Sequence, residues 1–144
     1  MAGILKEWNI NECAISFAGI MFSGGADGEV LSIEPGGDDF GDVNGADGEV
    51  TSFRTNEARA TATIKLMQTS QMVAPLLAIR NVDLAALAGA GVGAFQAANL
   101  LTGERVEAPQ ARIMAPPTMG YGRDPSVREF KIRLFNPVFT PGTP

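Results

Sequence analysis

The chain has 144 residues and a mass of 15.1 kDa, which is the size of one domain. Apolar residues make up 45% of it and charged residues 19%, so a packed core is expected, and 17 Gly and 9 Pro predict many turns. The absence of His and the single Cys exclude Ser-His-Asp and Cys-His catalysis, His-ligated metals, zinc clusters and internal disulfides, and the net charge of −5 argues against tight binding of nucleic acid.

The first elements predicted are strands. Apolar residues alternate over residues 12–19, as in a half-buried strand, and residues 20–22 continue this strand. The turn at residues 23–28 contains an Asp-Gly pair, and residues 29–34 have the composition of a second strand. These two strands are therefore predicted to form a hairpin.

Residues 35–48 are predicted to be a long loop, because they contain five Gly, four Asp and one Asn. Loops of this length in a small domain are usually functional or mobile. The pentapeptide Ala-Asp-Gly-Glu-Val ends this region at residues 46–50 and also occurs at residues 26–30, which we interpret as two Asp-Gly turns that open strands. The acidic residues do not have the spacing of a twelve-residue calcium loop, so they are interpreted as a solvated acidic segment.

The next strands are predicted at residues 50–55 and 59–67, and the second has the clearest alternation in the chain, with apolar residues on one face only. A helix is predicted from residue 72 to about residue 81, with Ser70 as its N-cap. Pro75 requires that the helix start nearby or have an irregular first turn. A further turn at residues 83–88, ended by Gly89, leaves open whether the helix is broken.

The last third returns to strands at residues 94–100, 105–114 and 126–136, with a loop at residues 115–125. The C-terminal tail, residues 137–144, contains three Pro and is not expected to join a central strand. Six or seven strands and one helix predict a mainly β domain spanning residues 1–144. Its architecture is expected to be an antiparallel β-sandwich or barrel with one flanking α-helix.

No catalytic, cofactor-binding or metal-binding residues are expected. The chain lacks the glycine-rich motifs that bind phosphate groups, and its single Trp and single Tyr do not make the aromatic platform of a sugar hydrolase. The start of the chain lacks the pattern of a secretory signal, and the longest uncharged segment, residues 84–103, has too many Gly and polar residues for a membrane span. These exclusions favour a protein that acts through its surfaces and strand edges.

Short motifs in a fixed order resemble one known family. They are Lys-Glu-Trp-Asn at residues 6–9, Ile-Ser-Phe at 15–17, Ala-Asp-Gly-Glu-Val at 46–50, Arg-Thr-Asn at 54–56, Thr-Ala-Thr-Ile-Lys-Leu at 61–66 and Gln-Thr-Ser at 68–70, followed by a Leu-rich helix and a closing strand of alternating charged and apolar residues. Over residues 6–136 this order is similar to that of the tail tube proteins of tailed bacteriophages, best known from contractile tails. Pro75 and the glycine-rich loop depart from the family pattern.

The resemblance implies a structural virion protein, made in the host cytoplasm, whose hexameric rings stack into a tube. It implies tail sheath, baseplate and tail terminator proteins as partners and transient passage of double-stranded DNA without specific binding. Because six copies carry a formal charge near −30, the bore is expected to repel phosphate if the acids face it. Because the polar face of the one-sided strands is expected to line the aqueous channel, the side chains expected to face the lumen are Thr61, Thr63, Lys65, Glu129, Lys131 and Arg133, which carry charges of both signs.

The inter-ring contacts are expected in the polar or irregular segments, namely the N-terminal arm (residues 1–11), the long loop and the C-terminal tail. The candidate contact residues are Trp8, Asp38, Asp39, Phe40, Asp42 and Asn44. The alternative function is a β-structured binding or baseplate module of a phage or secretion particle. An enzyme is the third interpretation.

Overall fold

The computed structural model describes residues 8, 10, 13–22, 30–86 and 89–142. One helix, α1 (Val73–Ala85), accompanies ten strands in this part of the chain. The strands are β1 (Cys13–Phe17), β2 (Ile20–Met21), β3 (Leu31–Pro35), β4 (Phe40–Asn44), β5 (Val50–Arg54), β6 (Arg59–Met67), β7 (Gly93–Asn99), β8 (Arg105–Ala115), β9 (Val127–Phe135) and β10 (Val138–Thr140).

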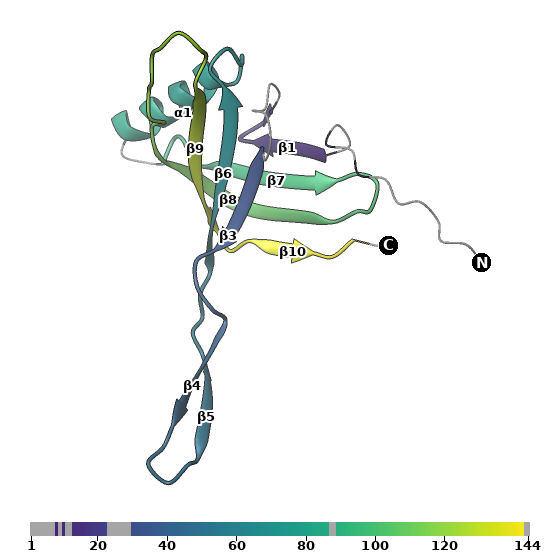
Figure 1. Cartoon of the computed structure of the whole chain (residues 1–144), viewed down its shortest axis with the longest axis vertical. Helices are drawn as coiled ribbons and strands as arrows, with labels where there is room; N and C mark the ends of the chain where they lie inside the picture. Colours follow the sequence, from purple (N-terminus) through teal and green to yellow (C-terminus); the bar gives the residue numbers. More distant parts are fainter. Residues whose placement is uncertain (1–7, 9, 11–12, 23–29, 87–88, 143–144) are drawn as a thin grey trace, which may run out of the picture.

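Eight strands form one sheet in the order β2-β1-β7-β8-β9-β6-β3, with β10 also paired to β8, and every pairing is antiparallel. The sheet is strongly bent, so that β1, β7, β8 and β10 run across the direction of β3, β6 and β9 (Figure 1). The first group of strands forms one layer of the molecule and the second group forms the other. The eleven-residue strand β8 belongs to both layers, since its first half pairs with β7 and β10 and its second half with β9. Pro109, which has no N–H to donate, lies where β8 changes partners. The predicted mainly β, antiparallel fold with one flanking helix is confirmed.

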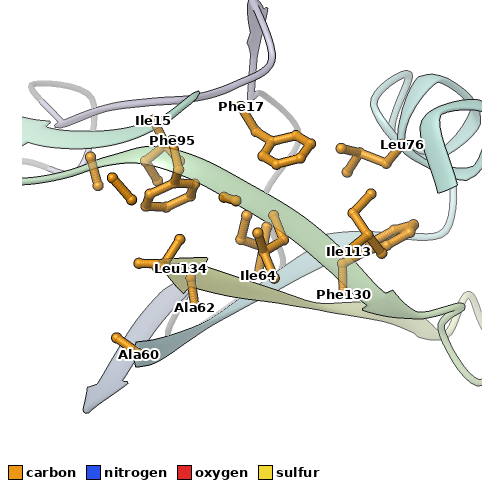
Figure 2. Close-up of a cluster of buried hydrophobic side chains, with 14 of the residues drawn as sticks. Ile15, Phe17, Ala60, Ala62, Ile64, Leu76, Phe95, Ile113, Phe130 and Leu134 are labelled. Atoms are coloured by element: carbon orange, nitrogen blue, oxygen red, sulfur yellow. The ribbon is translucent and has the colours of Figure 1, made fainter. Parts of the chain in front are cut away.

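The core lies between the two layers and is closed on one side by α1 (Figure 2). Phe17 and Phe95 project into it from the first layer, and Ile64 and Phe130 from the second. Leu76 is the fully buried residue of the helix and faces Phe17 across the core. The inward residues of β6 and β9 are the ones that the alternation predicted, because a strand with one buried face must place every second side chain inside.

The helix is continuous over Val73–Ala85 and is not broken. Pro75 is its third residue, in the first turn, where backbone N–H groups have no partner within the helix. The predicted N-cap is wrong: Met72 occupies that position without a side-chain cap. The Ser70 hydroxyl instead accepts a hydrogen bond from the Met72 N–H at 3.2 Å and shapes the turn before the helix. Residues 87–88 of the expected further turn lie outside the described residues.

The hairpin predicted between residues 12–22 and 29–34 is wrong. β1 turns back at Ala18 and Gly19, both with positive φ, to pair with β2, and its other edge pairs with β7. β3 pairs with β6 instead. The expected turn at residues 23–28, and with it the first copy of the pentapeptide up to residue 29, lies outside the described residues. Alternation identified these strands but contained no information on their partners.

The loop predicted at residues 35–48 is also wrong in part, because residues 40–44 form β4. This strand pairs with β5 over five residues, from Phe40 opposite Arg54 to Asn44 opposite Val50. The resulting hairpin projects from the ends of β3 and β6, away from the rest of the molecule (Figure 1). We call residues 38–55 the arm.

The C-terminal tail contributes one short strand. β10 pairs with the beginning of β8, with Phe139 opposite Val106, and it lies between Pro137 and Pro141. It is a three-residue edge strand, as expected of a segment in which Pro removes backbone donors.

Candidate assembly surfaces

The arm exposes apolar side chains on both of its faces. Strand register places Phe40 and Val50 on one face and Val43 and Phe53 on the other. All four are exposed, and Phe40 has 57% of its surface accessible. A two-stranded hairpin with no further packing is marginal in water, and isolated exposed apolar ribbons promote association. The arm therefore has the properties of a segment that is covered by another molecule in an assembly.

Local contacts give the arm a defined shape. The Phe53 ring lies over Gly41, where an added Cβ would come within 2.6 Å of the ring, so any larger residue at position 41 would displace it. The Arg54 guanidinium lies 5.4 Å from the centre of the Phe40 ring. At the tip, Gly48 has a φ of 87°, and the Asp47 carboxylate accepts a hydrogen bond from the Glu49 N–H at 3.1 Å. The Asp-Gly pair thus turns the chain between β4 and β5, as such pairs do in hairpins.

The base of the arm is closed by hydrogen bonds between its two ends. The Thr55 N–H donates to the Asp39 carbonyl at 3.0 Å, and the Thr55 hydroxyl donates to the Asp38 carbonyl. Beside them, the Glu57 carboxylate accepts hydrogen bonds from the Arg59 side chain, which hold the pKa of Glu57 below its usual value and raise the pKa of Arg59. An open cavity of about 550 Å³ at this base is lined by Pro35, Gly37, Asp38, Asp39, Glu57, Ala58, Arg59, Asn136, Pro137 and Phe139.

Five of the six residues proposed for inter-ring contacts lie in the arm. Asp38 and Asp39 are at its base, and Phe40, Asp42 and Asn44 are in β4, all exposed. Trp8 is 69% exposed but is not part of the arm. Of the separate N-terminal segment, residues 1–11, only Trp8 and Ile10 are among the described residues. Sequence reasoning missed the other strand of the arm as a contact surface, including Val50, Phe53 and Arg54.

The six residues proposed to face the lumen come together on one face of the sheet. Strand register pairs Thr61 with Arg133, Thr63 with Lys131 and Lys65 with Glu129. Glu129 and Lys131 are exposed, and the other four are half-buried. We call this set the β6–β9 outer face.

The charge of the β6–β9 outer face differs from the charge of the whole chain. It carries Lys65, Lys131 and Arg133 against one acid, Glu129. By contrast, the arm contains five acids and one Arg, a formal charge of −4. The net charge of −5 is therefore concentrated at the arm and does not by itself make this face acidic.

Three strands of the eight-stranded sheet have an unpaired edge within the part of the chain that the structure describes: β2, β3 and β10. The edge of β3 is the longest of them. The Val30 carbonyl accepts a hydrogen bond from the Lys65 N–H at 2.8 Å, and the Gly36 N–H donates one to the Arg59 carbonyl at 2.9 Å. Because bonding alternates along an antiparallel strand, Leu31 and Ile33 direct their backbone groups away from β6. Such free groups can pair with a strand of another molecule.

At the end of the molecule opposite the arm, a buried Arg holds the loop between β8 and β9. Arg128 is only 3% exposed and points inward from β9, in phase with Phe130. Its guanidinium donates to the Gly120 carbonyl from two nitrogens at 3.4 Å and to the Ser126 hydroxyl, and it lies 5.5 Å from the centre of the Tyr121 ring. Among the described residues no carboxylate forms an ion pair with it. The alternation of β9 contained the signal for this site, because Arg128 occupies an inward position.

Replacing this buried Arg tests its role in fixing the loop. We expect Arg128→Met to release residues 115–125, because the hydrogen bonds to Gly120 and Ser126 are lost, while a buried aliphatic side chain keeps the core filled. Chymotrypsin should then cleave after Tyr121 several-fold faster, as measured by mass spectrometry of timed digests. Arg133→Met, on the opposite face of the same strand, is the control and should leave the cleavage rate unchanged. Equal rates in the Arg128 variant and the unmodified protein would contradict the role.

The described residues show neither a metal site nor a membrane-spanning helix. No group of three or more Cys, Asp or Glu side chains gathers there in an arrangement that would hold a metal ion. Within the same part of the chain, no helix has the length and apolarity needed to cross a bilayer. The features that remain as candidate sites are the arm, the β6–β9 outer face, the free strand edges and the fixed loop.

Comparison with solved structures identifies proteins of the same fold. The anti-feeding prophage cap, described as a tube terminating cap, aligns with a TM-score of 0.62 over 97% of this chain and 95% of its own, at 6% identity. The sheath/tube terminator of the extracellular contractile injection system PVC, in its extended state, aligns with a TM-score of 0.60 over 96% of this chain and 100% of its own, at 8% identity. No protein-family model and no curated protein matches the sequence. The chain therefore has the fold of components that terminate the tubes of contractile injection systems.

Proposed function

We propose that this protein is a structural subunit of a contractile tail or a related injection particle, and that it forms rings which belong to the inner tube. The observation that carries the proposal is the exposed arm, with apolar residues on both faces, on a fold shared over nearly its full length with tube terminators. Neither neighbour is described as an enzyme, and the composition argues against the common catalytic arrangements. The function proposed for the protein is therefore assembly into this particle.

The strand edges support the proposal of ring formation. A copy that pairs its β3 edge with a free edge of its neighbour satisfies the outward backbone groups of both. Repetition of this pairing around an axis closes a ring, and six copies are proposed here. In that ring the β6–β9 outer face lines the lumen, and its mixed charges allow double-stranded DNA to pass without being specifically bound. The proposed location is the virion tail, and the proposed partners are sheath, baseplate and terminator proteins.

A second candidate function is supported by the comparisons. Both solved neighbours are named as terminators, and in this second function the ring is the last one of a tube and not one of its repeating units. A binding or baseplate module is the remaining alternative. Negative-stain microscopy of the purified protein separates these functions: hollow rods support the tube subunit, discrete rings the terminator, and single-copy particles at high concentration the binding module. The last outcome would remove the proposal of ring formation.

The role of the β3 edge is tested by Ile33→Pro. Proline removes the N–H that faces away from β6, and it is tolerated at edge positions of this kind. We expect folded subunits, with the near-ultraviolet circular dichroism retained, that no longer form rings in sedimentation velocity. Ile33→Ala is the matched control, because it removes more of the side chain, which packs against the core, but keeps the N–H. Rings of normal size from the Pro variant would show that this edge is not used.

A further inference from the structure

The two ends of the molecule differ in chemistry along its long axis. The arm lies at one end, and the loop between β8 and β9 lies at the other, beyond the beginning of β9 (Figure 1). We call residues 119–128 the platform. A surface at one end that fits a different surface at the opposite end makes a head-to-tail contact, which generates stacks.

The platform is an exposed surface with a fixed shape. Tyr121 is 82% exposed, and Met119, two residues before it, and Val127, at the beginning of β9, are also exposed. The buried Arg128 and the Ser126 hydroxyl both bond to the Gly120 carbonyl, the latter at 3.0 Å. Exposed Tyr on a preorganised backbone is typical of the anchors of protein interfaces, since little conformational entropy is lost on binding.

The charges of the two ends are complementary. The arm carries a formal charge of −4, whereas the platform contains Arg123 and Arg128 against Asp124, a formal charge of +1. The positive charge of Arg128 is not neutralised by a described carboxylate, so it adds to the potential at the surface of the platform. The strands of the arm, five residues each, extend for about 17 Å.

From these observations we infer that the platform of one copy receives the arm of a second copy in the adjacent ring. One apolar face of the arm, either that of Phe40 and Val50 or that of Val43 and Phe53, packs against Tyr121 and Met119. The acidic side chains of the arm then lie close to the positive charges of Arg123 and Arg128. The inference rests on the proposed function, because it names the surface that the arm contacts when rings stack.

Site-specific photo-crosslinking tests this contact. Tyr121→benzoylphenylalanine is prepared as an equal mixture of ¹⁵N-labelled and unlabelled copies, assembled, irradiated and digested for mass spectrometry. We expect mixed-label cross-links from position 121 to the arm, residues 38–55. The control is Leu101→benzoylphenylalanine, at an exposed turn between β7 and β8, which should give no cross-link to the arm.

The outcomes separate the inference from the proposed function. Rods in which position 121 cross-links to residues outside the arm overturn the inference and leave the tube function standing. Discrete rings without arm cross-links overturn the inference and favour a terminator. Single-copy particles without cross-links overturn both.

Discussion

Removal of the arm is expected to abolish stacking while leaving the subunit folded. Because Thr55 donates a hydrogen bond to Asp39, residues 40–54 can be replaced by Asn-Gly, which closes the two strands with a tight turn. The deleted side chains are exposed and contribute no buried residue to the core, so the midpoint of thermal unfolding should change by only a few degrees. Negative-stain microscopy should show no rods at protein concentrations at which the unmodified protein forms them.

A pair of substitutions tests the same surface without shortening the chain. Val43→Ser and Phe53→Ser together remove the apolar groups from one face of the arm. If each side chain is buried in the stack, the loss is about 1.5–3 kcal/mol apiece, which raises the concentration needed for assembly by about 100-fold or more. Thr51→Ser, on the same face, is the matched control and should assemble normally. Rods from the double variant at unchanged concentration would exclude this face of the arm from the contact.

The largest effect on folding is expected from Phe130→Ala. Phe130 is 0% exposed and lies on β9 near Leu76 and Ile113 in the core (Figure 2). Truncation of a buried Phe costs about 3–5 kcal/mol, because transfer energy is lost and a cavity remains. For a domain of this size the midpoint of thermal unfolding should fall by about 6–20 °C.

Urea unfolding followed by far-ultraviolet circular dichroism measures this loss directly. Val127→Ala is the control, since Val127 lies on the same strand but is exposed, and its effect should be about 0.5 kcal/mol or less. A change of similar size in the two variants would mean that Phe130 does not belong to the packed core.

Sequence reasoning succeeded where a pattern is local and one-sided. The bounds of β6 were predicted at Arg59 and Met67, and its alternation correctly separated buried Ala and Ile from the polar outer face. The same alternation is sufficient to place the six lumen candidates on one face of the sheet, although their position in an assembly stays a proposal. The helix was predicted from apolar residues that recur with a helical period, and Pro75, which counted against it, lies in its first turn.

The arm was missed for a physical reason. Phe40 and Val43, like Val50 and Phe53, are three residues apart, so in a strand they lie on opposite faces and leave no alternation to detect. A ribbon that is apolar on both faces and rich in Gly and Asp has the composition of a loop. The Asp-Gly pair at residues 47–48 was the remaining signal, and it was interpreted as the beginning of a strand and not as the centre of a hairpin.

The sequence by itself determined the class of fold, since one-sided alternation over several segments requires antiparallel sheet with one buried face. It also determined that the chain lacks the residues of the common catalytic triads. Only the tertiary structure decided that β1 pairs with β2 and β7, that β3 pairs with β6, and that Arg128 holds Gly120 at the end opposite the arm. The pairings of β1 with β7 and of β3 with β6 join residues far apart in the chain. Neither these pairings nor the contact of Arg128 with Gly120 leaves a periodic pattern in any single segment.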